Sequence, residues 1–217
     1  MKADPICNDN NNIIIIIIII IIIIIIIMNL RAILAALSLD ALVASAADTS
    51  ATVKALANTL HIMMDLSSLT ADAAIDIFPS TVGRFLSDVI GGFELITTTA
   101  DNEVLALSIS KEKAEKALDA SMQKDICENY HAFADVYRIL MEIVIGKNDT
   151  LAMVLLNSTT APPDTPGQLE DRVDGCSRAI MSLTQLTLPL VPDCASSIAN
   201  DQGRYNETTK ELKSVLH

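Results

Sequence analysis

The stretch ICENYHAFADVYRILMEIVIG, residues 126–146, decides the fold class. Its apolar residues recur at alternating steps of four and three, and they are Ile126, Tyr130, Phe133, Tyr137, Leu140 and Val144. This spacing places them on one face of an α-helix, and Gly146 supplies a helix-ending residue soon after the last of them. The stretch therefore predicts a long helix whose apolar face packs in a protein core.

Four further segments show the same spacing of apolar residues, and a fifth contains the strong helix formers KEKAEKAL. We expect helices over residues 53–66, 82–96, 110–122, 168–186 and 195–216, in addition to the one over 126–145. Proline marks three of the boundaries, at Pro79, in the Pro-rich loop at 162–167, and at Pro189 and Pro192. Leu105, Leu107 and Ile109 alternate as in a strand, but one strand would have no partner, so we expect helix or extended linker there. The sequence thus predicts an all-α fold, an antiparallel bundle of five to six helices.

Composition and charge limit the possible functions. The chain has 217 residues, with 15 Lys and Arg against 27 Asp and Glu, a net charge of −12 and a pI near 4.5. This balance, without any basic run, argues against a nucleic-acid-binding protein and against a polybasic membrane-surface anchor. Tryptophan is absent, aromatic residues are 3%, and there are only 7 Gly and 7 Pro, which argues against a sandwich or barrel with many tight turns.

The N-terminal part of the sequence is expected to be a targeting segment rather than part of the folded domain. Fifteen consecutive isoleucines follow an Asp- and Asn-rich stretch, and we interpret residues 1–27 as a low-complexity extension ahead of a biological start at Met28. Residues 28–46 then have one positive charge, a short apolar core and an Ala-Ser-Ala ending, as in a secretory signal peptide cleaved before Ala47 or Asp48. The alternative is a membrane anchor that includes the isoleucine tract, since the combined apolar stretch is long enough to span a bilayer.

Residues 47–217 are expected to form a single helical-bundle domain with the marks of export. They hold 13 basic and 24 acidic residues, and their length suits one domain with its own core. Three N-glycosylation sequons begin at Asn148, Asn157 and Asn206. We therefore expect a secreted glycoprotein, extracellular or in the cell wall.

Three cysteines remain in this domain, Cys127, Cys176 and Cys194, which allows one disulfide and one spare thiol in an exported chain. If the helices over 126–145 and 168–186 are antiparallel neighbours, the end of the second returns to the start of the first and brings Cys194 near Cys127. We therefore prefer a Cys127–Cys194 disulfide and expect Cys176 to be a buried free thiol or an intermolecular link. All three thiols stay reduced only if the signal-peptide interpretation fails.

The sequence offers little catalytic chemistry. Cys127, His131 and Asp135 are spaced by four on one helix, and Cys-His pairs can bind metals or activate a thiolate. A disulfide at Cys127 would remove that thiol, and the sequence has no second ligand cluster, Gly-rich phosphate loop or Gly-x-Ser-x-Gly elbow. We therefore expect no enzyme, no catalytic residue, no bound metal and no cofactor.

The apolar residues allow a more specific interpretation. Six methionines in the domain suit an adaptable interior. These methionines either fill an ordinary core or belong to an interior that binds lipid. A lipid-binding bundle would hold an acyl chain between its helices, or would open to lay apolar faces on a hydrophobic surface. In that case the lining or contact residues would be Phe93, Phe133, Tyr137, Leu140, Met141 and Met181.

Three strings of residues carry a family resemblance. They are VIGGFELITTTADN at 89–102, ICENYHAFADVYRILMEIVIGK at 126–147 and LEDRVDGCSRAIMSLTQLTLPLVPDCA at 169–195. They resemble the fungal hydrophobic surface-binding protein A family, also called cell-wall galactomannoproteins, over most of residues 48–216. The resemblance implies a small secreted helical bundle of the fungal cell wall or medium, without catalysis of its own, that adsorbs to hydrophobic surfaces. It also implies fatty acids, secreted esterases or cell-wall polysaccharide as partners.

These observations together favour two functional hypotheses, ahead of a third in which Cys127 serves a secreted thiol or metal enzyme. The first is a secreted, non-catalytic protein that binds hydrophobic surfaces or lipids, fatty acids in particular, through apolar helix faces. The alternative is a secreted effector or inhibitor that recognises a protein partner through a helical face. Neither hypothesis involves nucleic acid.

Overall fold

The computed structural model describes residues 49–110, 118–157 and 166–216, and these are almost entirely helical. The elements are α2 (Thr49–Ile75), α3 (Val82–Ser110), α4 (Ala120–Ile145), α5 (Asn148–Asn157), α6 (Pro166–Thr187), the 3-10 helix η1 (Leu188–Leu190) and α7 (Ala195–Leu216). No strand occurs within these ranges, which confirms the predicted all-α bundle. None of the described helices combines the length and apolar character that a membrane crossing requires.

The described residues all belong to one compact unit, Ala47–His217. The predicted low-complexity extension, the signal peptide and the alternative membrane anchor all lie outside the described residues.

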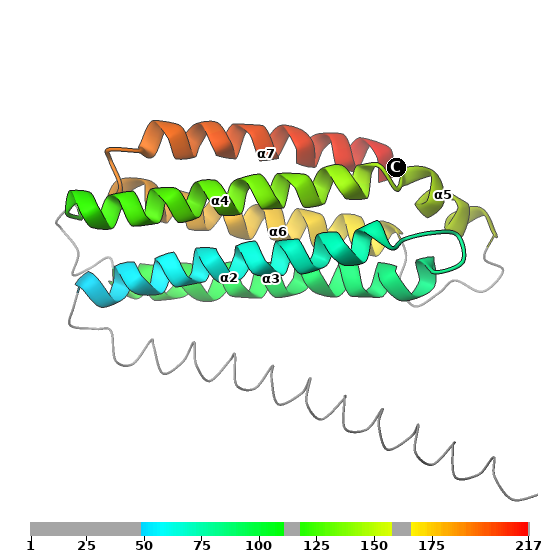
Figure 1. The fold of residues 1–217 in the computed structure, drawn as a ribbon, viewed down its shortest axis with the longest axis horizontal. Coiled ribbons are helices and arrows are strands. Elements are labelled where there is room, and N and C mark those ends of the chain that lie inside the picture. Colours follow the sequence, from blue (N-terminus) through cyan, green and yellow to red (C-terminus); the bar gives the residue numbers. More distant parts are fainter. Residues whose placement is uncertain (1–48, 111–117, 158–165, 217) are drawn as a thin grey trace, which may run out of the picture. The chain divides into compact units, whose positions relative to one another are not determined.

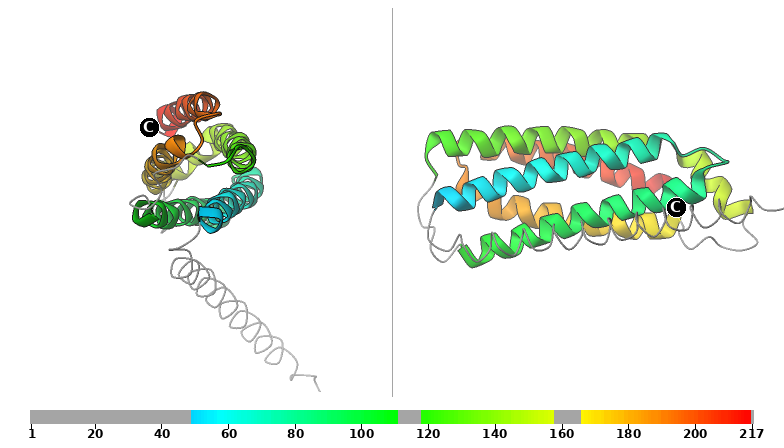
Figure 2. Two further views of the ribbon diagram at one scale, coloured as in Figure 1. Left: turned by 90° about the vertical axis from the view of Figure 1, so that its left-hand side faces the viewer. Right: turned by 60° about the horizontal axis from the view of Figure 1, so that its bottom comes forward.

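Five long helices form a ring around a shared core. Each packs against two neighbours in the cyclic order α2, α3, α6, α7, α4, and the end-on view of Figure 2 shows this ring. Long helices that follow one another in sequence are antiparallel (Figure 1), whereas three pairs of neighbours in the ring, α2 with α4, α3 with α6 and α4 with α7, run parallel. Consecutive long helices of the bundle are thus antiparallel, whereas three pairs of non-consecutive helices pack in parallel.

The stretch that decided the fold class is α4. Asp119 caps its start, because its carboxylate accepts a hydrogen bond from the Met122 amide at 2.9 Å. Gly146 ends it, with its N–H donating to the Glu142 carbonyl at 3.0 Å. All six apolar residues predicted to face the core, from Ile126 to Val144, are buried. The sequence prediction of a central core helix is therefore confirmed.

The segment before α4 differs from the prediction. A separate helix over 110–122 is wrong in its described part, because Leu118 and Asp119 are not helical. Instead α3 continues as one helix through the alternating stretch 105–109 to Ser110. The residues between α3 and Leu118 lie outside the described ranges. The ten-residue helix α5 was not expected, because no helix was predicted between Gly146 and the Pro-rich loop.

Gly92 explains how closely α2 and α3 pack. A Cβ atom on Gly92 would lie 2.1 Å from Oγ1 of Thr70 in α2, whereas a Cβ atom on Gly91 would meet nothing within 4 Å. The Thr70 hydroxyl is also engaged, since it donates to the Leu66 carbonyl at 2.6 Å. Only the second glycine of the Gly91-Gly92 pair is therefore required by helix packing.

Candidate functional site

The side chains predicted to contact lipid lie mostly at the centre of the core. Five of them are completely buried and the sixth is half-buried; the five are Phe93, Phe133, Tyr137, Leu140 and Met141, and the sixth is Met181. The Tyr137 ring packs against Phe93, Phe133 and Tyr205, with ring centroids 5.7 to 6.3 Å apart. The helices would have to separate before the buried five could contact a lipid.

Cys176 lies in the same core. It is unpaired and completely buried, beside Tyr137 and Thr97. Burial raises the pKa of its thiol to about 12, so the thiol is neutral and unreactive near neutral pH. Of the two predictions for Cys176, the structure therefore agrees with the buried free thiol. The buried sulfur is not exposed for an intermolecular link.

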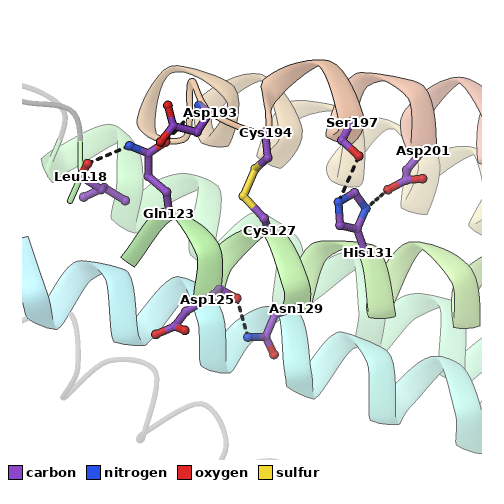
Figure 3. The surroundings of a disulfide bond; sticks show 10 residues. All are labelled: Leu118, Gln123, Asp125, Cys127, Asn129, His131, Asp193, Cys194, Ser197 and Asp201. Atoms are coloured by element: carbon purple, nitrogen blue, oxygen red, sulfur yellow. Dashed lines mark hydrogen bonds and ion pairs between the residues drawn. A yellow bond between two sulfur atoms is a disulfide. The ribbon is translucent and has the colours of Figure 1, made fainter. Parts of the chain in front are cut away.

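A disulfide joins Cys127 near the start of α4 to Cys194 just before α7, as predicted (Figure 3). The helix that brings Cys194 there is not the expected neighbour, because α7 rather than α6 packs beside α4. Gln123 adds a polar link one turn earlier in α4. Its side chain donates to the Leu118 carbonyl at 2.8 Å and accepts from the Asp193 amide at 3.0 Å.

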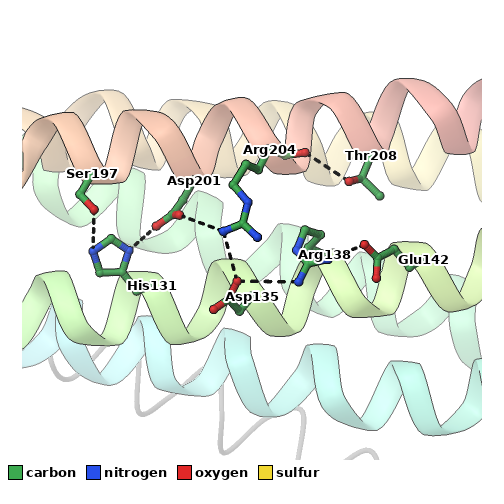
Figure 4. Close-up of polar contacts among 8 residues, drawn as sticks. All are labelled: His131, Asp135, Arg138, Glu142, Ser197, Asp201, Arg204 and Thr208. Atoms are coloured by element: carbon green, nitrogen blue, oxygen red, sulfur yellow. Dashed lines mark hydrogen bonds and ion pairs between the residues drawn. The ribbon is translucent and has the colours of Figure 1, made fainter.

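The Cys127, His131 and Asp135 set does not converge on a site. Cys127 is in the disulfide, and Asp135 lies 3.7 Å from Arg204. His131 instead pairs through Nδ1 with the Asp201 carboxylate, while its Nε2 lies 3.2 Å from the Ser197 hydroxyl (Figure 4).

The sequence analysis did not predict the contacts of Ser197 and Asp201 of α7. The signal available was weak, because their spacing of four places them on one helix face without revealing that α4 lies opposite. No group of three His, Cys, Asp or Glu side chains suited to a metal ion is present in the described part of the chain.

Most of the exposed large apolar side chains belong to two adjacent helices. Among the described residues, six large apolar side chains are between 45% and 66% exposed: Leu69, Ile75, Phe78, Leu105, Ile109 and Ile139. Five of the six belong to α2, α3 or the turn between them, which together we call the α2–α3 layer. Charge follows the opposite trend, since α2 carries three charged residues among 27 and α7 carries six among 22.

One carboxyl group is buried inside the α2–α3 layer. Glu103 of α3 accepts a hydrogen bond from the Thr59 hydroxyl of α2 at 2.8 Å, while its other oxygen has no hydrogen-bond partner. Burial raises the pKa of this carboxyl, and the Thr59 hydrogen bond offsets part of the increase.

The asparagine of each predicted sequon lies in a helix. Asn148 is the first residue of α5 and half-buried, Asn157 is the last residue of α5, and Asn206 is half-buried within α7.

No family model matches the chain, and a comparison with curated proteins finds no match either.

Proposed function

We propose that the protein is exported and binds hydrophobic surfaces or lipids through the outer face of its α2–α3 layer. The observation that carries this proposal is the concentration of exposed apolar side chains there, with Leu69, Leu105 and Ile109 each more than half exposed. Complete burial of one such side chain contributes roughly 1.5–3 kcal/mol. Contact of several of them with an apolar surface therefore provides enough free energy for adsorption.

The closed core supports contact at the outer face rather than carriage of an acyl chain inside. The central aromatic rings already contact one another, and Phe93, Phe133 and Tyr137 have no exposed area. An acyl chain at the outer face needs no separation of the helices. Fatty acids are accordingly partners as components of an apolar surface.

The charge of the protein predicts the kind of surface. With a net charge of −12, the chain is repelled by anionic surfaces, so a neutral apolar surface is the expected partner. Adsorption driven by apolar burial is also insensitive to added salt, in contrast to binding between opposite charges.

The test measures depletion of purified protein from solution by neutral octyl-coated beads, at low salt and in 1 M salt. The variant L69Q/L105Q/I109Q changes three exposed side chains of the layer. We expect it to bind at least about tenfold more weakly, a loss of about 1.4 kcal/mol or more. Ile139→Gln changes the large exposed apolar residue of α4, which is 45% exposed, and serves as the control outside the layer.

Circular dichroism checks that both variants keep their helices. Equal adsorption of the triple variant and the native protein would refute the α2–α3 layer as the contact face. Loss of adsorption in 1 M salt would refute the apolar mechanism altogether.

A further inference from the structure

Ser197, His131 and Asp201 form a hydrogen-bonded chain between α7 and α4 that surface adsorption does not use (Figure 4). The ionised Asp201 carboxylate can only accept, so it requires a proton on Nδ1 of His131. In a neutral imidazole this leaves Nε2 free to accept the hydroxyl proton of Ser197, 3.2 Å away. Ser-His-Asp hydrolases connect their nucleophile, general base and orienting carboxylate in the same order.

The scaffold holds these three side chains on two fixed helices. Ser197 and Asp201 are one turn apart on α7, and the Cys127–Cys194 disulfide joins α4 to the start of α7 beside them (Figure 3). Cys127 lies one turn before His131 on α4. The disulfide therefore limits how far the Ser197 hydroxyl and the imidazole can move apart.

The exposure of each group suits its role. Ser197 is exposed, the His131 side chain is 36% exposed, and the Asp201 carboxylate is only 13% exposed. The hydroxyl is thus open to a substrate, whereas the orienting carboxylate is shielded from water.

The start of α7 also supplies hydrogen-bond donors. Ser197 is the third residue of α7, next to the positive end of the helix dipole. The amides of Ala195 and Ser196 belong to the first turn, whose N–H groups have no acceptor within the helix. Such donors stabilise the negative oxygen that forms when a carbonyl is attacked.

We propose that Ser197, His131 and Asp201 are a catalytic triad that hydrolyses accessible carboxylic esters. The Ser197 oxygen attacks the ester carbonyl carbon and its proton passes to Nε2 of His131. The bond to the alcohol oxygen then breaks, and the alcohol leaves with that proton. Water cleaves the resulting acyl-serine with His131 again taking and returning a proton, which releases the carboxylic acid and restores Ser197. An open helix surface fits short acyl esters that need no enclosing pocket.

The test is labelling of the purified protein with a fluorophosphonate, which reacts with serine hydroxyls activated by a general base. Intact mass and peptide mapping locate the adduct. We expect one adduct on Ser197, no adduct in Ser197→Ala, and labelling about 100-fold slower in His131→Gln. Ser182→Ala is the control: Ser182 is another exposed helical serine, whose hydroxyl donates to the Arg178 carbonyl at 3.0 Å, and its loss leaves labelling unchanged.

Turnover of p-nitrophenyl acetate gives a second readout. Histidine side chains hydrolyse this ester slowly on their own, so only the part of the rate lost in Ser197→Ala counts. Asp201→Asn is expected to slow labelling while leaving the helical spectrum unchanged, because Asn does not hold the Nδ1–H form of the imidazole. Absence of an adduct on Ser197, or equal labelling rates in the native protein and His131→Gln, would overturn the proposal.

Discussion

Gly91 and Gly92 are adjacent residues of α3 with opposite surroundings, which makes them a matched pair. Gly92→Ala places a methyl group against Thr70 of α2, and we expect it to lower the free energy of unfolding by roughly 1–3 kcal/mol. Gly91→Ala adds a methyl group in open space and is expected to raise it by about 0.5–1 kcal/mol through helix propensity. Urea unfolding measures both, and changes of the same sign would contradict the close approach of the two helices.

The buried tyrosines provide a second matched pair. The Tyr130 hydroxyl forms a 2.7 Å hydrogen bond with Thr184 of α6, whereas the Tyr137 hydroxyl has no oxygen or nitrogen partner and lies beside the weakly hydrogen-bonding thiol of Cys176. We expect Tyr130→Phe to cost about 1 kcal/mol of stability, and Tyr137→Phe to cost nothing or to stabilise slightly. Thermal unfolding of the two variants checks this, and equal losses would show that the Tyr137 hydroxyl is bonded in solution.

Glu103 predicts a pH dependence with a definite sign. Burial raises the pKa of its carboxyl in the folded state, so folding favours the protonated form. Its contribution to stability is therefore complete below the ordinary pKa of 4.5 and is lost as the pH rises through the raised folded value. Urea unfolding between pH 4.5 and 7 should show the native protein losing stability relative to Glu103→Gln. Parallel curves for the two proteins would contradict this.

At the scale of helices, local sequence patterns predicted the bounds of the helices better than they predicted which helices pack together. The last helix was expected over 195–216 and α7 spans the same residues, because the prolines before it interrupt any earlier start. The start of α4 was placed too late, since the Asp119 cap precedes the apolar stripe. The Cys127–Cys194 pair was predicted, because antiparallel succession along the chain brings both cysteines to the same end of the bundle.

The contacts of His131 were beyond prediction for a related reason. They depend on α7 packing parallel to α4, and the spacing of apolar residues within each helix does not specify which helices pair. Glu103 was missed because nothing in its local sequence distinguishes a buried carboxylate from the exposed ones around it.

The disulfide allows a prediction for the α4–α7 pair. It spans 67 residues, for which the chain-entropy model gives at most about 4 kcal/mol of stabilisation. The double variant C127A/C194A is expected to unfold at a lower temperature and to label more slowly at Ser197. A reductant should lower the melting temperature of the native protein but not that of the variant. An effect of the reductant on the variant would show that it acts elsewhere.

At the scale of the whole bundle, the two proposed activities lie on different sides. The end-on view of Figure 2 places α7 opposite the α2–α3 layer, within the unit that begins at Ala47. Protein adsorbed through that layer would therefore keep Ser197 in contact with solution. We expect fluorophosphonate to label Ser197 equally fast in free and bead-bound protein. Protection of Ser197 on the beads would show that the molecule adsorbs through α4 and α7 instead.

The order of the cysteines has a consequence for how the protein is made. Cys176 is buried in the native state, yet it lies between Cys127 and Cys194 in the chain. During synthesis in an oxidising compartment, Cys127 therefore meets the wrong partner before the correct one emerges. A bond between Cys127 and Cys176 would have to be exchanged through a mixed disulfide before α6 could dock. With the export proposed above, production of this protein would depend on disulfide isomerisation, and Cys176→Ala would change the yield more than the stability of the finished molecule.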